Sequence, residues 1–364
     1  MNYLELSTPA LMIDLDVLER NLGRMALYCR EHGLRLRPHT KTHKTPEVAR
    51  MQLDRGACGL TVAKVGEAEV MASATDAEIL VAYPIFGTEK LRRLAALAKR
   101  RSLLIALDNQ KTAQEVSRAA TAQDSTLSVL VELDVGFGRT GFQQGSACVE
   151  LARKIQKMPG LRFSGLMLFA GNIWGNALER QCATTQVKMQ VSCVLRAFAD
   201  DRMPVEIVSG GSTPGAFLSD QITGLTEVRP GTYVYNDLNT YYQGVCQLDD
   251  CAARVVATIV STAVPGRAII DAGSKALSSD LLSAGPRQGY GYVVEAPDAN
   301  LFRLNEEHGY LDISGSNHQF FVGEVVTVIP NHVCTCVNMH DEVFTIRNGE
   351  VTGTWRVAAR GKIQ

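Results

Sequence analysis

Residues 103–133 read LLIALDNQKTAQEVSRAATAQDSTLSVLVEL and carry the clearest fold signal in the chain. The stretch begins and ends with short apolar runs, 103–107 and 127–133, which have the length of buried strands. Between them, residues 110–120 place apolar side chains at helical spacing. The stretch therefore predicts one strand-then-helix unit followed directly by the next strand.

The same alternation continues outward in both directions, from Leu11 to Tyr235. Eight apolar runs are predicted to be strands, at 34–38, 59–63, 79–83, 103–107, 127–133, 163–169, 206–209 and 227–230. Helical patterns lie between them at 17–31, 89–100, 110–120, 149–157 and 182–199. Eight such units fit a (β/α)8 barrel better than an open doubly wound sheet, which needs fewer strands per half and a glycine fingerprint. We predict an α/β fold with a TIM-like barrel over residues 12–243.

After about Gly244 the pattern changes to β-rich runs separated by Gly, Asn and Asp turns. Strands are predicted at 253–260, 267–271, 325–329 and 343–346. Asn348-Gly349 is a strong hairpin signal between the last of these runs and Val351. We predict an all-β second domain over 244–364, which residues 1–11 are expected to join.

The bulk composition is that of an ordinary globular protein, with 46% hydrophobic and 21% charged residues and a net charge of −1. This charge gives no reason to expect nucleic acid or an anionic membrane as partner. The apolar stretches are interrupted by charge before they reach membrane-spanning length, and the N-terminus lacks the pattern of a signal peptide. The nine cysteines show no disulfide-framework spacing, which suits a reducing cytoplasm. We expect a cytoplasmic protein.

The first predicted strand runs into Arg37-Pro38-His39-Thr40-Lys41-Thr42-His43-Lys44. In a barrel of this kind, reactive groups lie where strands end, at the carboxyl face. A lysine attacks a carbonyl only as the neutral amine, which desolvation or neighbouring cations favour. We expect Arg37 and Lys44 to crowd Lys41 in this way. Taken alone, a basic loop is more often a solvated surface or an anion site.

The strand at 206–209 runs into Gly210, Gly211, Ser212 and Thr213. Glycines allow the backbone to approach a phosphate closely, and N–H groups at a helix start carry partial positive charge. Barrel phosphate sites commonly use the loops after the seventh and eighth strands, so the position along the chain is right. Most turns of this composition are only turns.

A pair of metal-ligand side chains stands near the C-terminus, at His332 and Cys334. On an extended chain, this spacing puts the imidazole and the thiolate on one side, where they can chelate one ion. Cys336 would lie on the same face as a third candidate. The alternative is a buried cysteine beside a capping histidine.

Thr8-Pro9-Ala10-Leu11, Asp14-Leu15 and the segment 37–44 resemble the fold-type III family of D-threonine aldolases and D-serine dehydratases. The resemblance extends over nearly the whole chain. It implies an alanine-racemase-type barrel with pyridoxal 5'-phosphate (PLP) carried on Lys41 and His39 close to it. It also implies a homodimer in which the β-domain of one chain completes the partner's site.

Further segments carry the resemblance and assign the other binding residues. Residues 131–141 match the segment that places an arginine on the ring side of the cofactor, here Arg139. Residues 210–213 match the family's Gly-Gly-x-Thr phosphate loop, and 229–235 match the segment that supplies a tyrosine near the phosphate. Strand alternation would send Tyr233 and Tyr235 to one face, so the sequence does not choose between them.

The resemblance also implies a divalent metal at His332 and Cys334, because the family binds one there through His-x-Asp or His-x-Cys. A thiolate favours Zn²⁺, whereas a carboxylate would favour Mg²⁺ or Mn²⁺. PLP stabilises negative charge at Cα, and a metal polarises a β-hydroxyl. Retro-aldol cleavage would give glycine and an aldehyde, whereas dehydration, with Lys41 removing the Cα proton, would give a keto acid and ammonia.

The sequence is divided between these two reactions. The tail at 337–362 and Glu307-His308-Gly309 resemble the aldolases, whereas the His332/Cys334 pair resembles the zinc dehydratases. The loop at 169–175 lacks the histidine that serves the aldolases as base, so cleavage would need another base, either a metal-bound hydroxide or His43.

We predict a lyase for small D-β-hydroxy amino acids, cleaving them as D-threonine aldolases do. D-serine or D-threo-3-hydroxyaspartate dehydratase is the alternative, and a non-catalytic PLP-binding protein is a more distant one. A complete second domain and a metal pair argue against the binding protein, because a carrier needs no metal.

Overall fold

The computed structural model describes residues 1–283, 285 and 288–364. The chain forms two compact units, and both are assembled from segments distant in sequence. The β unit comprises Met1–Gly23, Thr42–Glu47 and Thr232–Arg360. The barrel unit comprises Arg24–Lys41, Val48–Gly231 and Gly361–Gln364.

The barrel unit is built on an eight-stranded parallel sheet in the order β2-β9-β8-β7-β6-β5-β4-β3. Its strands are β2 (Arg35–Leu36), β3 (Leu60–Val62), β4 (Ile79–Val81), β5 (Leu103–Leu107), β6 (Leu127–Leu133), β7 (Leu161–Leu168), β8 (Ile207–Gly210) and β9 (Glu227–Val228). The amides of Cys58 and Thr61 donate to the carbonyls of Leu36 and Pro38, which joins the two ends of this order. All eight predicted strands are present, and the α/β barrel prediction is confirmed.

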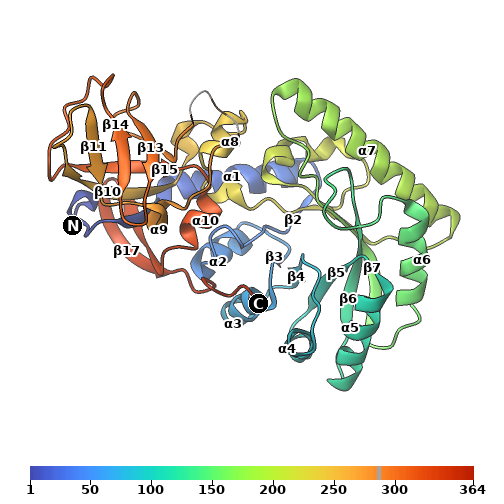
Figure 1. The fold of residues 1–364 in the computed structure, drawn as a ribbon. Helices are drawn as coiled ribbons and strands as arrows, with labels where there is room; N and C mark the ends of the chain where they lie inside the picture. Colours follow the sequence, from blue (N-terminus) through green and yellow to red (C-terminus); the bar gives the residue numbers. More distant parts are fainter. Residues whose placement is uncertain (284, 286–287) are drawn as a thin grey trace. The chain divides into compact units, whose positions relative to one another are not determined.

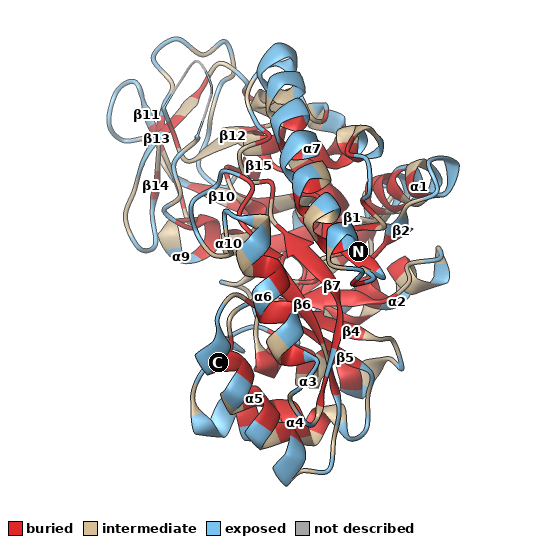
Figure 2. Cartoon of the chain, turned by 90° about the vertical axis from the view of Figure 1, so that its right-hand side faces the viewer, coloured by how far each residue is buried: buried red, intermediate tan, exposed pale blue. Residues whose placement is uncertain are grey.

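Helices follow the strands, and α4 to α7 lie along the outside of the sheet (Figure 1). The helices are α1 (Leu15–Glu31), α2 (Pro46–Asp54), α3 (Val65–Ala74), α4 (Thr88–Ala98), α5 (Gln110–Ala122), α6 (Gly145–Ile155) and α7 (Ala177–Asp200), with a 3₁₀ helix η2 at Thr213–Gln221. Figure 2 shows the barrel strands β4 to β7 mainly buried and helices such as α5 and α7 with both buried and exposed residues. The sequence missed α2 and α3, because α2 is short and most of α3 is buried, leaving no apolar stripe to recognise.

The β unit contains a nine-stranded mixed sheet. Its strands are β1 (Ala10–Asp14), β10 (Ala253–Ser261), β11 (Arg267–Ile270), β12 (Gly291–Val293), β13 (Asn300–Leu304), β14 (Gly309–Asp312), β15 (Val325–Pro330), β16 (Glu342–Arg347) and β17 (Glu350–Arg356). Strand β1 pairs antiparallel with β10 and parallel with β16. The predicted hairpin joins β16 to β17, with Asn348 and Gly349 both at positive φ, 51° and 79°.

The sequence predicted an all-β second domain, but the structure also contains helices there. Short helices interrupt it: η1 (Tyr3–Glu5), η3 (Thr232–Val234), α8 (Leu238–Tyr242), η4 (Leu248–Asp250), α9 (Ser274–Leu277) and α10 (Val333–Val337). Helices of one turn are too short to show a periodic apolar pattern, so sequence reasoning passes over them. Throughout the described part of the chain, no helix combines the length and the apolar character needed to cross a membrane.

Candidate functional site

Lys41 lies at the carboxyl end of β2 in the barrel unit. Residues 37–40 prolong the strand, because the amide of Arg37 donates to Val228 and that of His39 donates to Pro230. The amide of Lys41 donates to Nδ1 of His39 at 3.3 Å, and the lysine side chain is half-buried. The lysine therefore stands where barrels carry their reactive groups.

Arg37 does not crowd Lys41 as the sequence predicted. Its guanidinium lies inside the barrel, where it pairs with Glu227 and Glu78, each at 2.9 Å. Burial alone would lower the pKa of Arg37, but the Glu227 carboxylate raises it above its ordinary value. Side chains alternate along an extended chain, and this register turns Arg37 inward.

The residues that follow Lys41 belong to the β unit and are firmly anchored there. His43 is fully buried, and its Nδ1 accepts a hydrogen bond from the amide of Thr45 at 3.1 Å. Lys44 has a positive φ of 53°, and its Nζ donates to the carbonyl of Ala359 at 3.4 Å. The carbonyl of Lys44 also accepts the Ala359 amide at 3.0 Å, so both ends of Lys44 hold the C-terminal tail.

The predicted phosphate loop follows β8 and starts the helix η2. Gly211 has φ +79°, a conformation that favours glycine. Ser212 is the N-cap residue of η2, yet its side chain makes no capping bond and instead donates to the carbonyl of Ala170 at 3.2 Å. The side chain of Thr213 accepts the amide of Gly231 at 3.3 Å. A helix start without a side-chain cap presents N–H groups suited to a phosphate.

Tyr233 and Tyr235 do not lie on a strand, so the expectation that both point to one face of a strand is wrong. Strand β9 ends at Val228, and the chain then turns through the 3₁₀ helix Thr232–Val234 of the β unit. Tyr235 is completely buried, and this burial raises the pKa of its hydroxyl. Tyr233 is buried as well.

The loop that carries Arg139 follows β6 and is organised by Asp134. One carboxylate oxygen of Asp134 accepts the amides of Gly136, Phe137 and Gly138 at 3.1, 2.9 and 3.0 Å. Burial would raise the pKa of Asp134, but these bonds hold it below its ordinary value. Arg139 is exposed, and its guanidinium lies 4.4 Å from the ring centre of Phe169.

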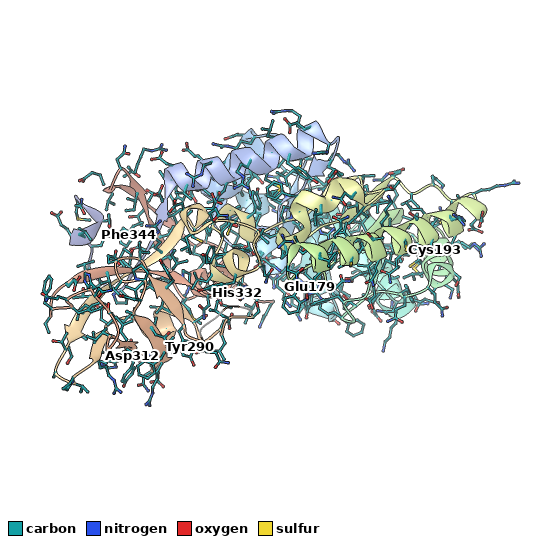
Figure 3. The ribbon with its side chains drawn as sticks, turned by 90° about the horizontal axis from the view of Figure 1, so that it is seen from above. Glu179, Cys193, Tyr290, Asp312, His332 and Phe344 are labelled. Carbon is teal, nitrogen blue, oxygen red and sulfur yellow. The ribbon has the colours of Figure 1, made fainter. Side chains whose placement is uncertain are left out.

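His332, labelled in Figure 3, and Cys334 lie at the start of α10 in the β unit. Their side chains hydrogen-bond to each other, and this bond raises the pKa of His332 to about 9 against the effect of burial. Nδ1 of His332 lies 2.7 Å from the Asp280 carboxylate, which also accepts the Thr335 hydroxyl at 2.8 Å. Sγ of Cys334 lies 3.2 Å from the hydroxyl of Thr42.

The backbone between the two ligands is fixed by Asp237. One oxygen of this buried carboxylate caps α8 by accepting the amide of Thr240 at 2.9 Å, and the other accepts the amide of Val333 at 3.0 Å. Asp237 and Asp280 are residues that sequence reasoning missed. They lie far from α10 along the chain, and no local motif marks them.

The pair does not lie on an extended chain, because His332 is the N-cap of a helix that begins at Val333. Successive helical residues are turned by about 100°, so Cys334 and Cys336 point to nearly opposite sides. Cys336 is buried, and its thiol donates to the carbonyl of Ala276 at 3.2 Å. Burial raises the pKa of Cys336 to about 12, which suits a core thiol and not a third ligand.

The geometry fits a metal ion. A ligating histidine commonly has its other ring nitrogen held by a carboxylate, as Asp280 holds Nδ1 of His332, and nitrogen with sulfur suits Zn²⁺. The residues that the structure describes contain no group of three or more His, Cys, Asp or Glu side chains able to hold a metal. The protein therefore offers two ligands and leaves the other positions open.

Two family models match the chain, the N-terminal domain of alanine racemase at residues 13–239 and a putative serine dehydratase domain at residues 252–346. The chain belongs to the alanine-racemase-like family of D-threonine aldolases and D-serine dehydratases. The family resemblance predicted from the sequence is thereby confirmed. D-threonine aldolase of Arthrobacter sp. is 30% identical over 360 residues, which is 97% of this chain and 93% of that one.

Solved structures of family members superpose over the whole chain. D-threonine aldolase from Filomicrobium marinum is 31% identical, with a TM-score of 0.93 over 100% of this chain and 98% of that one. D-threo-3-hydroxyaspartate dehydratase from Delftia sp. HT23 is 32% identical, with a TM-score of 0.89 over 98% of each chain.

Two further structures of D-threo-3-hydroxyaspartate dehydratase bear on the metal pair. One is a histidine-to-alanine mutant, and the other is a cysteine-to-alanine mutant in the metal-free form. The two substituted positions are two residues apart in that enzyme. His332 and Cys334 have the same spacing here.

Proposed function

We propose that this protein is a lyase for D-β-hydroxy amino acids that uses PLP on Lys41 and a divalent metal on His332 and Cys334. The observation that carries the proposal is the Thr42–Cys334 contact at 3.2 Å, because Thr42 is the residue next to Lys41 in the chain. The residue beside the reactive amine and the sulfur ligand are thus held together. Lys41 suits an aldehyde cofactor, and the His332/Cys334 pair suits a metal ion.

The barrel unit supplies the cofactor site in this proposal. Lys41 would bind PLP covalently, residues 210–213 would hold its phosphate at the start of η2, and Arg139 would lie on its ring side, with His39 below the lysine. Tyr233 and Tyr235 both stay candidates for the tyrosine near the phosphate, because both are buried. PLP supplies an electron sink for negative charge at the substrate Cα.

The β unit supplies the metal site. Nε2 of His332 and Sγ of Cys334 would be the ligands, with Asp280 orienting the imidazole, and the donor set favours Zn²⁺ over Mn²⁺ or Mg²⁺. When bound, the metal supplies a Lewis acid for the β-hydroxyl of the substrate. The amine of Lys41 is the group able to take the Cα proton.

Cleavage of the Cα–Cβ bond is the first candidate reaction, favoured by the overall likeness to D-threonine aldolase over the whole chain. Elimination of the β-hydroxyl is the second, favoured by the His-x-Cys spacing and by the loop at 169–175. That loop has no titratable side chain to take the hydroxyl proton. His43 stays the predicted base for cleavage, although its ring is buried and its Nδ1 is bound to Thr45.

Product analysis separates the two reactions. The purified protein is incubated with D-threonine, D-serine and D-threo-3-hydroxyaspartate, with and without chelator, and with the L-isomers as controls. Glycine with an aldehyde supports cleavage, and a keto acid with ammonia supports elimination. A protein that binds PLP but turns over no D-isomer would be a carrier, and the lyase proposal would fall.

We further infer the organisation of the whole protein. Residues 12–243 would form the PLP domain, and residues 244–364 with 1–11 the domain of the metal ligands, a division supported by the extents of the two family models. A homodimer is expected from the resemblance and is tested by light scattering. No disulfide joins any of the nine cysteines. A cytoplasmic location stays a proposal, tested by cell fractionation.

A further inference from the structure

Glu132 is a buried carboxylate at the carboxyl end of β6, with only 2% of its surface exposed. Its Oε1 accepts the hydroxyl of Thr140 at 2.7 Å. Its Oε2 is also buried and has no hydrogen-bond donor among the residues that the structure describes. A buried acceptor without a donor lowers stability, so stability alone does not account for this oxygen.

The buried arginines of the barrel have partners other than Glu132. Arg37 pairs with Glu227 and Glu78 at 2.9 Å each. Arg229 donates at 2.7 Å to the Ser209 hydroxyl, which in turn donates to Glu227 at 2.6 Å. Arg35 also pairs with Glu227, at 3.6 Å, so three arginines reach these two carboxylates directly or through Ser209. Glu132 stands outside these hydrogen bonds and ion pairs, and burial raises its pKa.

Arg139 is a cation close to Glu132 in the chain. Arg139 precedes Thr140, the residue that already binds Glu132. Within the described ranges, Arg139 has no carboxylate at ion-pair distance, and its guanidinium rests on the rings of Phe169 and Phe137, 4.4 and 5.3 Å from their centres. The charges of Arg229 and Arg139 both act on Glu132 in the direction that favours its carboxylate form.

The loop between the two residues is too well fixed to move as a whole. Gly141 donates to the Asp108 carboxylate at 3.2 Å, and Phe142 donates to the carbonyl of Glu132 at 3.0 Å. A Cβ at Gly141, which has φ +100°, would lie 2.6 Å from the amide nitrogen of Asp134, so the loop packs directly on the strand. The exposed side chain of Arg139 can therefore turn while the backbone of the loop stays in place.

We propose that Glu132 is the positioning residue for Arg139, whose guanidinium turns from the two rings to donate to Oε2 of Glu132 when PLP occupies the barrel mouth. Thr140 holds the other oxygen, so the carboxylate presents Oε2 in one orientation. The arginine charge is then fixed beside the cofactor ring. This inference rests on the proposed function, because it takes Arg139 to lie on the ring side of PLP.

The competing explanation is that Glu132 only compensates the buried charge of Arg229. The two explanations differ in what Glu132→Gln does. If Glu132 serves Arg229, the variant of the cofactor-free protein melts at a lower temperature and binds PLP normally. If Glu132 serves Arg139, the variant melts at the same temperature or higher, because a buried charge with one unsatisfied oxygen has been removed. The same variant then binds PLP less tightly, because Arg139 has lost its partner.

The test is a double-mutant cycle on PLP affinity, measured by absorbance titration of the cofactor-free full chain. We expect E132Q and R139L each to weaken PLP binding about tenfold, and the double variant to be no weaker than R139L. E150Q, which removes an exposed carboxylate of the same unit, is the control and binds as wild type. E132D, which keeps the charge but shortens the side chain, is expected to weaken binding too.

Three results would overturn the proposal. They are an E132Q effect that persists undiminished in the R139L background, normal PLP affinity in both Glu132 variants, and a lower melting temperature of E132Q with unchanged affinity. If wild type itself binds no PLP, the proposed function fails, and this inference fails with it. A wild type that binds PLP with E132Q unaffected overturns the inference alone.

Discussion

Replacement of Asp280 by alanine should weaken zinc binding without disturbing the fold. The Asp280 carboxylate holds Nδ1 of His332 at 2.7 Å and so leaves Nε2 as the nitrogen for the metal. Loss of such a carboxylate typically costs 10–100-fold in metal affinity. Because the Asp280 side chain is 41% exposed, water partly replaces it, and we expect the lower end of that range. The expected loss is about tenfold, or ~1.4 kcal/mol.

The assay is competition for Zn²⁺ against a chromophoric chelator, with apo protein at fixed pH. Asp280→Asn keeps an acceptor but not the charge, so it should fall between alanine and wild type. Asp312→Asn is the matched control, since the Asp312 carboxylate accepts hydrogen bonds from the nearby Ser314 and lies apart from His332 in the β unit (Figure 3). Zinc affinity of Asp280→Ala equal to wild type, with His332→Ala binding none, would refute the reasoning about Asp280.

Three further predictions concern the barrel unit. Gly211→Ala should lower stability by ~1–3 kcal/mol and weaken PLP binding, because φ is +79° and the new Cβ would lie 3.1 Å from Cβ of Val228; equal melting temperatures would contradict this. Glu227→Gln should cost ~3–5 kcal/mol in urea unfolding, since it leaves the buried Arg37 guanidinium without its main partner, and a loss below 1 kcal/mol would count against it. The folded-state pKa of Asp134 is held below its unfolded value, so its contribution is complete above that unfolded value and is lost as the pH falls through the folded pKa. Asp134→Asn should therefore show a flatter loss of stability in acid than wild type.

Sequence reasoning worked where a local pattern is set by local physics. The central barrel strands are short, mainly apolar runs, and burial on both faces produces that pattern in a parallel sheet. The Asn348-Gly349 hairpin succeeded for the same reason, because positive φ at both positions restricts the residue types. The sequence placed Lys41 at a strand end, because the apolar pattern at 34–38 predicted the strand before it.

The rest depends on tertiary contacts that no local pattern encodes. Asp280 contacts His332 only in the folded β unit, and the loop that bears it carries no motif. Cys336 looked like a ligand because the chain was taken as extended, and a one-turn helix reversed its direction. Arg37 looked like a free cation because its partner, Glu227, lies on another strand. In each case a contact or a turn of the folded chain, and not the local sequence, decides the role of the side chain.

The central claim is that the amine of Lys41 binds PLP, and borohydride reduction followed by peptide mapping tests it most directly. The account predicts one reduced pyridoxyl group per chain, located on Lys41, and none on Lys44, whose Nζ is engaged with Ala359. Lys41→Ala should abolish the label and leave the melting temperature of the cofactor-free protein close to that of wild type. A label on another lysine, or none on position 41 of a protein saturated with PLP, would contradict the account.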